Sequence, residues 1–127
     1  MAATTAWTSD ELSKIGAAEE LQIAALQQDG SLRKPVTIWV VRNGDDLFVR
    51  SVNGRTAAWF RGGQVRHEAH IRAGGVDKDV LLVETNDLTD AIDTAYRTKY
   101  SHYAADIVNS DLTPLARAAT LKLVPRG

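Results

Sequence analysis

Residues 36–52 read VTIWVVRNGDDLFVRSV, and this stretch decides the fold. Val36–Val41 is a continuous β-branched and aromatic run, which is typical of a well-buried strand. Residues 43–46 (NGDD) supply a turn, and Leu47–Val52 (LFVRSV) predicts the next strand. Upstream, Leu21–Gln27 alternates apolar with polar or small residues and is followed by the turn signal Asp29-Gly30. Three strands joined by two tight turns predict an antiparallel meander.

The rest of the chain adds strands and helices around this meander. Period-2 patterning predicts strands over Glu68–Ala73, Val76–Glu84 and Ala119–Val124. Helices are predicted for residues 8–16, which begin with capping-box spacing, for residues 56–64, and for a long segment from Asp87 to Val108. Most connections are short, so the sheet is expected to be mainly antiparallel and curled into a small barrel of about six strands. The fold class is mainly β (α+β), and we expect a single domain over residues 1–127.

Composition excludes several classes of protein. The 127 residues are 44% hydrophobic and 24% charged, as in globular domains. The absence of Cys excludes a disulfide scaffold, thiol catalysis and Cys-ligated metals. No apolar run approaches the ~20 residues of a membrane span. The first 16 residues lack the hydrophobic region of a signal peptide, so a cytoplasmic location is expected.

Charge is distributed unevenly along the chain. Between Arg33 and Arg72 eight Lys or Arg face three acids, whereas between Ala73 and Thr113 three face eight. Two interpretations remain open: the basic half attracts an anionic ligand, or the two halves pair with each other. Nucleic acid is not expected as a partner, because the net charge is −1. No metal site is expected either, because His67 and His70 would point to opposite faces of a strand.

The segment Val49–Arg61 (VRSVNGRTAAWFR) is the most informative for function. A strand ends, the chain turns at Asn53-Gly54, and a helix begins near Thr56, so free N–H groups there can bind a phosphate. The side chains of Ser51, Asn53 and Arg55 can add hydrogen bonds, and Trp59 supplies a flat apolar surface. The alternative is an ordinary Asn-Gly turn with a solvated Arg55.

The same segment resembles the split barrels that bind flavin or deazaflavin, the superfamily of pyridoxamine-phosphate oxidases and deazaflavin-dependent nitroreductases. The nitroreductase pattern Ser-Asn-Gly followed by Ala-Trp-Tyr is similar to Ser51, Asn53, Gly54, Ala58, Trp59 and Phe60. Gly30, Arg33, Lys34 and Pro35 resemble that family's basic hairpin, and residues 119–125 (ATLKLVP) resemble its last strand. The chain as a whole also resembles a small bacterial family of unknown function. It departs from the nitroreductases at residues 27–31 (QQDGS), which stand where these carry Gly-Arg-Lys-Ser-Gly.

The resemblance implies a small antiparallel split β-barrel with helices across its openings and a flavin- or deazaflavin-dependent oxidoreductase. FMN or a deazaflavin coenzyme would be the cofactor. The implied cofactor-binding residues are Arg33, Lys34, Ser51, Asn53, Gly54, Arg55 and Trp59, with no catalytic acid or base assigned. The alternative is a cofactor-free protein that uses the same pocket for a small molecule, as a binder or a non-redox biosynthetic enzyme. A homodimer is expected.

The end of the chain carries one further signal. Residues 123–127 (LVPRG) resemble a thrombin cleavage sequence, so a native and an added C-terminus both remain open.

Overall fold

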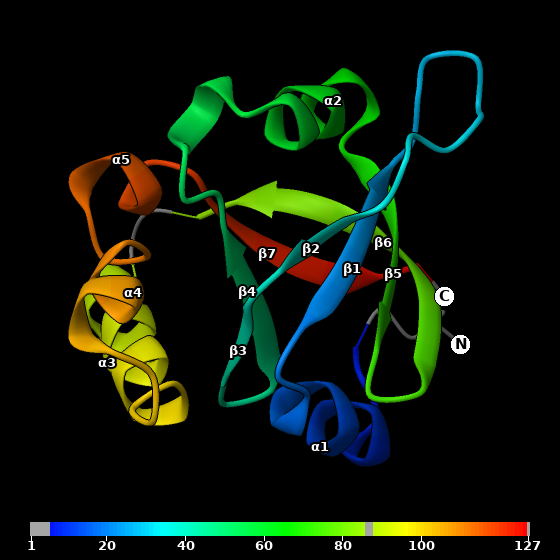
Figure 1. Cartoon of the computed structure of the whole chain (residues 1–127). Helices are drawn as coiled ribbons and strands as arrows, with labels where there is room; N and C mark the ends of the chain where they lie inside the picture. Colours follow the sequence, from blue (N-terminus) through cyan, green and yellow to red (C-terminus); the bar gives the residue numbers. More distant parts are fainter. Residues whose placement is uncertain (1–5, 86–87, 127) are drawn as a thin grey trace.

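The computed structural model describes residues 6–85 and 88–126. Its seven strands form one antiparallel sheet in the order β2-β1-β5-β6-β7-β4-β3, which curls into a nearly closed barrel (Figure 1). The strands are β1 Leu21–Ala25, β2 Val36–Ile38, β3 Val40–Asn43, β4 Asp46–Arg50, β5 Glu68–Ala73, β6 Val76–Glu84 and β7 Thr120–Pro125. The predicted mainly β barrel is therefore confirmed, with seven strands among the described residues.

Helices lie at both ends and on one side of the barrel (Figure 1). α1 (Ser9–Ala17) and α2 (Ala58–Arg66) lie at opposite ends, and a 3-10 turn, η1 (Gly54–Thr56), leads into α2. α3 (Thr89–Lys99), α4 (Ala105–Asn109) and α5 (Pro114–Arg117) lie beside β3 and β4. The predicted capping box of α1 is confirmed, because Thr8 and Glu11 each bind the other's backbone N–H through their side chains.

The predicted single strand Val36–Val41 is wrong. The chain breaks at Trp39 into β2, which pairs with β1, and β3, which pairs with β4. These two strands form the two edges of the sheet although they follow each other in sequence. The bend has a packing cause: Val40 is buried in the barrel core, whereas Trp39 stacks outside it on Tyr100, with ring centroids 3.8 Å apart. The split of the barrel is the opening beside this bend.

The predicted long helix from Asp87 to Val108 is also wrong. Asp87 lies outside the described residues, and the segment contains two helices, α3 and α4, with a turn between them. The Tyr100 hydroxyl donates to the backbone oxygen of Glu19, and the Tyr103 hydroxyl to its carboxylate. These contacts hold the turn against the chain that enters β1, so the helix ends there.

α2 contains two glycines and runs past them to Arg66, beyond the predicted end at residue 64. A Cβ at Gly62 would lie 2.7 Å from Cδ of Arg33, and one at Gly63 would lie 2.8 Å from Cδ1 of Leu82. Both glycines therefore let other segments pack against α2. This close approach holds the aliphatic part of Arg33 on the helix.

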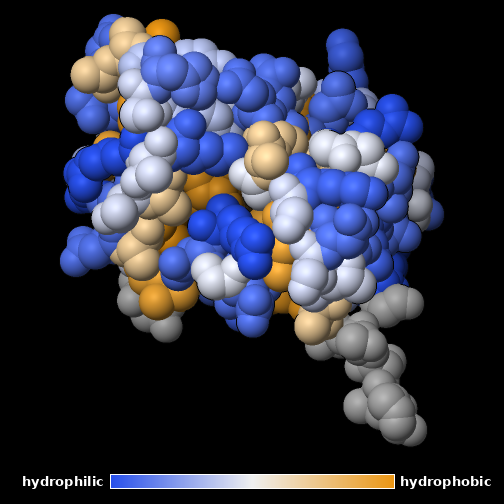
Figure 2. Space-filling model, turned by 90° about the horizontal axis from the view of Figure 1, so that it is seen from below, coloured by the Kyte–Doolittle hydropathy of each residue, from blue (hydrophilic) through white to orange (hydrophobic). Residues whose placement is uncertain are grey.

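Two apolar clusters hold the fold together. The first fills the barrel and includes Trp7, Leu47, Val49 and Phe60. The second lies between β3–β4 and the helices α3 and α4, and comprises Val41, Phe48, Ile92, Tyr96, Tyr100, Val108 and Leu112. Seen from the α1 end, the surface is mostly hydrophilic, with hydrophobic groups showing mainly in recesses (Figure 2). None of the described helices is long and apolar enough to span a membrane.

Candidate functional site

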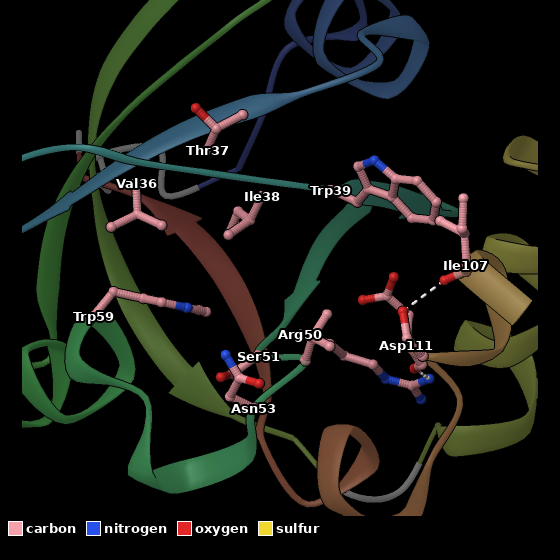
Figure 3. A pocket seen from close by; sticks show the side chains of 12 residues that line it. Val36, Thr37, Ile38, Trp39, Arg50, Ser51, Asn53, Trp59, Ile107 and Asp111 are labelled. Carbon is pink, nitrogen blue, oxygen red and sulfur yellow. Dashed lines mark hydrogen bonds between the residues drawn. The ribbon is translucent and has the colours of Figure 1, made fainter. Parts of the chain in front are cut away.

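A cavity of about 410 Å³ opens in the split of the barrel (Figure 3). Its volume falls within the range of small-molecule sites, roughly 300–1,000 Å³. The walls come from β2, the end of β4 and the loop after it, the start of α2 and the end of α4. The lining residues are Val36, Thr37, Ile38, Trp39, Arg50, Ser51, Val52, Asn53, Trp59, Ile107, Ser110 and Asp111.

Ser51 is the polar group of this cavity that most needs a ligand. Ser51 is fully buried, and its Oγ has no hydrogen-bond partner among the described residues. Its backbone is fixed by β7 and the turn, since its N–H donates to Ala119 and its carbonyl accepts from Gly54. An unpaired buried hydroxyl costs about 1–3 kcal/mol, so its position in a cavity wall indicates a site that a ligand completes.

A second cavity of about 350 Å³ adjoins the first. Val36 and Trp59 line both cavities, and the second is also lined by Arg33, Lys34 and Pro35 from the β1–β2 hairpin. Within the described part of the chain, neither Arg33 nor Lys34 forms an ion pair. Ala58 at the start of α2 also lines this cavity, and α2 begins without a side-chain cap or an acidic residue in its first turn. The second cavity is therefore electropositive.

The structure brings together most of the residues suggested by the sequence. Ser51, Asn53 and Trp59 meet in the first cavity, and Arg33, Lys34 and Trp59 meet in the second. Gly54 lies next to the site, but its N–H donates to Ser51 and is not available to a ligand.

Arg55 lies apart from both cavities. Its guanidinium forms an ion pair with Glu84 at 2.5 Å and donates to the backbone oxygen of Ala118. The hydrogen bond with Glu84 raises the pKa of Arg55, and the same contact lowers the pKa of Glu84. This pair joins the basic half of the sequence to the acidic half, as do Arg50–Asp93 and Arg72–Asp77. Internal pairing therefore accounts for part of the charge asymmetry, while Arg33 and Lys34 remain for a ligand.

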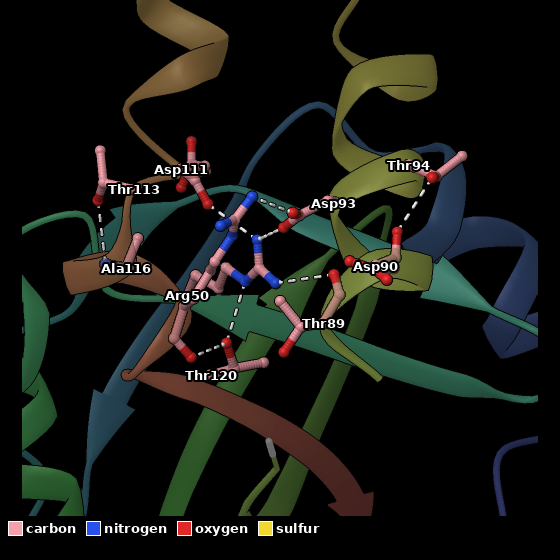
Figure 4. Close-up of polar contacts among 10 residues, drawn as sticks. Arg50, Thr89, Asp90, Asp93, Thr94, Asp111, Thr113, Ala116 and Thr120 are labelled. Carbon is pink, nitrogen blue, oxygen red and sulfur yellow. Dashed lines mark hydrogen bonds and ion pairs between the residues drawn. The ribbon is translucent and has the colours of Figure 1, made fainter. Parts of the chain in front are cut away.

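Behind the first cavity lies a buried polar network that the sequence did not indicate (Figure 4). The guanidinium of Arg50 donates to Asp93 at 2.5 Å, to the hydroxyl of Thr120 at 3.0 Å and to the backbone oxygen of Asp111 at 2.9 Å. Asp93 also accepts from Arg117. Burial alone would raise the pKa of Asp93, but the hydrogen bonds and charges of Arg50 and Arg117 hold it below its usual value.

Asp111 is the second residue that sequence reasoning missed. It follows α4, lines the cavity and is 4% exposed, and its carboxylate forms no hydrogen bond or ion pair with the described residues. Burial raises its pKa to about 6, against the opposing charge of Arg50. No local pattern marks this residue, because it is one of eight acids in the acidic half.

The histidines lie away from both cavities. His70 contacts Asp77 and Asp79 on the outer face of β5–β6, and His102 contacts Glu19. His67 caps α2 with a left-handed backbone, φ 56°. Over the described residues there is no cluster of three His, Asp or Glu suited to a metal ion.

A family model described as "Uncharacterized protein conserved in bacteria" (DUF2255) matches residues 11–123. The chain belongs to the DUF2255 family. No curated protein matches this DUF2255 chain.

Solved structures are similar to the DUF2255 chain over nearly its whole length. An F420 reductase aligns with a TM-score of 0.57 and 15% identity over 91% of this chain and 90% of that one. HutZ, the heme storage protein from Vibrio cholerae, aligns with a TM-score of 0.59 and 16% identity, over 94% and 90%. Campylobacter jejuni ChuZ aligns with a TM-score of 0.59 and 12% identity, over 92% of this chain and 51% of ChuZ. At these identities the likeness confirms the expected split-barrel fold.

Proposed function

We propose that this DUF2255 chain binds a flavin- or deazaflavin-type cofactor in the two adjoining cavities and acts as an oxidoreductase. The observation that carries the proposal is the pairing of two unlike cavities at Val36 and Trp59. One has aromatic walls and a buried hydroxyl, and the other has two cations. Within residues 6–85 and 88–126, the hydroxyl has no hydrogen-bond partner and neither cation has an ion-pair partner. A ligand with an aromatic ring system and an anionic tail matches this pair, because the ring suits the first cavity and the tail suits the second, adjoining one.

The first cavity suits the ring of such a cofactor. Trp39 and Trp59 supply flat surfaces, Val36 and Ile38 exclude water, and Ser51 Oγ can bond a polar atom on the ring edge. A bound flavin or deazaflavin would supply hydride transfer. The chain's own residues would bind the ring, fix its orientation and keep water from it.

The second cavity suits the phosphate-bearing tail. Arg33 and Lys34 can each make charge-assisted hydrogen bonds to a phosphate. The uncapped start of α2 adds N–H donors and the positive end of the helix dipole. Asn53 lines the first cavity and directly precedes η1, which leads into α2.

Heme is less well matched by the donor set. None of the three histidines lines either cavity, so neither cavity offers the axial His ligand by which heme iron is commonly held. A cofactor-free small-molecule site remains the alternative, and the experiment below separates it from the proposal.

We also propose that the chain forms a homodimer through the rim of the first cavity. Val52 and Ile107 line this cavity and are still 43% and 47% exposed, and β2 pairs with no strand on the side away from β1 within the described chain. A second copy would cover these side chains. Light scattering at tens of micromolar protein is expected to give twice the mass of the chain, and a monomer would contradict this proposal.

The test of function is a titration with three probes: FMN, riboflavin and a deazaflavin coenzyme. FMN should bind more tightly than riboflavin, which lacks the phosphate. Arg33→Ala/Lys34→Ala should weaken FMN by about ten- to a hundredfold and leave riboflavin unchanged, because charge-assisted hydrogen bonds contribute about 1.5–3 kcal/mol each. Ser51→Ala should weaken both.

Two matched variants serve as controls. Arg97→Ala removes an exposed arginine on α3, and Arg55→Ala removes the one paired with Glu84, so neither should change FMN affinity. Oxidation of the reduced complex by a nitroaromatic acceptor then tests the redox step. Equal affinity for FMN and riboflavin, with no effect of Arg33 and Lys34, would favour the cofactor-free alternative.

A further inference from the structure

Asp111 is the acidic residue among those that line the first cavity, and the proposed cofactor contacts do not use its carboxyl group. It stands at the end of α4, between Trp39 and Arg50 in the close-up of the cavity (Figure 3). The residue is 4% exposed and lines the cavity wall.

The surrounding charged groups do not neutralise this carboxylate directly. Arg50 on β4 is the nearest cation, but its donors are committed to Asp93, Thr120 and the backbone oxygens of Asp111 and Thr89. Arg117 on α5 is bound to Asp93. Two further titratable groups face Asp111: Tyr96 in α3 and Tyr100 at the C-terminal end of that helix, both buried. Burial raises the pKa of each tyrosine most, and the charge of Asp111 raises it further.

A ligand in the cavity changes the balance at this group. When the cavity fills, the carboxylate loses its water and gains no donor from the protein, which disfavours the ionised form. The protonated form has an O–H that can donate to an acceptor on the ligand. A ring that bears carbonyl groups presents such acceptors at its edge.

We propose that Asp111 recognises a hydrogen-bond acceptor on the ring of the cavity's ligand, and that the ligand binds together with one proton, which Asp111 carries. This inference rests on the proposed function, because it assumes that a carbonyl-bearing ring occupies the first cavity. It assigns to Asp111 a specificity-determining role and makes affinity depend on pH. The raised pKa of Asp111, about 6, places this dependence in the neutral range.

Riboflavin is the probe for the test, because the phosphate of FMN itself titrates near pH 6. In the wild-type protein the dissociation constant should rise toward about tenfold per pH unit above the titration of Asp111. Calorimetry at pH 7.5 in two buffers of different ionisation enthalpy should show uptake approaching one proton per riboflavin bound.

Substitutions locate the proton. Asp111→Asn keeps a donor that does not titrate, so it should bind riboflavin independently of pH and without proton uptake. Asp111→Leu removes the donor and should bind about tenfold more weakly than Asp111→Asn. His70→Gln removes a titratable group outside the cavity, whose pKa is raised by Asp79 and Asp77, and it should keep the wild-type pH dependence.

The outcomes separate the two proposals. Riboflavin binding that is independent of pH in the wild type, or proton uptake that persists in Asp111→Asn, overturns this inference and leaves the proposed function standing. Failure of riboflavin, FMN and the deazaflavin coenzyme to bind at any pH between 5.5 and 8.5 overturns both.

Discussion

Arg50 and Asp93 form an ion pair 2.5 Å long in which both side chains are buried, and it fastens β4 to α3. A second cation, Arg117, binds the other oxygen of the same carboxylate, and its side chain is 37% exposed. Because the segment that follows α3 carries Ile107 and Asp111 into the cavity wall, this pair positions one wall of the site. Loss of the Arg50–Asp93 pair should lower the stability of the protein and change the shape of the cavity.

Asp93→Asn should destabilise the protein by about 3–5 kcal/mol, because it leaves the buried guanidinium of Arg50 next to an uncharged side chain. Urea denaturation at pH 7 measures this loss. Asp90→Asn, an exposed acid one turn earlier on α3, is the matched control and should change stability by less than about 0.5 kcal/mol. Similar losses in the two variants would show that the buried pair contributes little.

Asp111→Asn should have the opposite effect on stability. Burial raises the folded-state pKa of Asp111 to about 6, above the unfolded value of about 3.9. The folded state is therefore favoured below the unfolded pKa, and this advantage is lost as pH rises through the folded pKa. At pH 8 the variant should be more stable than the wild type by on the order of 1–3 kcal/mol, and at pH 4 the difference should vanish.

Unfolding curves at both pH values check this prediction for Asp111. Asp106→Asn, on the exposed face of α4, is the control and should leave the stability near the wild-type value at both. A stabilising substitution of a group that also sets ligand affinity would be a trade-off between stability and function.

His70 should make stability depend on pH in the neutral range. A hydrogen bond with Asp79 raises its pKa, burial opposes this, and Asp77 raises it further. The contribution of protonated His70 to the stability of the folded protein is fully present below the unfolded pKa of about 6.5. It is lost as pH rises through the higher folded pKa. The half-exposed pair should be worth at most about 1 kcal/mol.

The measurement for His70 is the stability difference between wild type and His70→Gln at pH 6 and pH 9. The difference should shrink at the higher pH. Asp79→Asn removes the main partner on β6 and should shrink it as well. A difference that stays constant across this range would show that the contacts are not charge-dependent.

Two adjacent glycines allow a matched test of the contact between α1 and the barrel. Gly74 and Gly75 both have positive φ, 57° and 84°, in the β5–β6 turn. A Cβ at Gly74 would lie 2.3 Å from the backbone oxygen of Lys14 in α1, whereas a Cβ at Gly75 would meet nothing within 4 Å. Both Ala variants should lose about 1–2 kcal/mol through strain, and Gly74→Ala should lose at least about 1 kcal/mol more. Equal shifts in Tm would exclude a rigid contact.

Local signals in the sequence predicted much of the sheet, because turn residues and period-2 patterns act within a few residues. β5 and β6 have the predicted bounds, and the end of the chain forms a real strand, since Leu123 is buried and residues 123–125 belong to β7. The break at Trp39 could not be predicted, because a continuous apolar run contains no turn residue and the bend depends on Tyr100, far along the chain.

Part of the lining of the first cavity was predictable in the same way, while cofactor binding by these residues stays a prediction. Ser51, Asn53 and Trp59 follow one another around a turn, so a local motif found them. Arg55 shares that motif, but its orientation is set by Glu84, which is 29 residues away. Arg50 and Asp111 were missed because their roles arise from partners and walls that only the closed barrel brings together.

The position of β7 has a consequence for how the protein is made. This strand, Thr120–Pro125, lies between β6 and β4 and joins the hairpin β3–β4 to the rest of the sheet. During synthesis the ribosome releases β1 to β6 first, as an open sheet and a separate hairpin linked through Trp39. β7 then has to insert between the unpaired edges of β6 and β4. Until it does, both edges are open to pairing with other chains, so the nascent protein should depend on chaperones most in the interval before β7 is released.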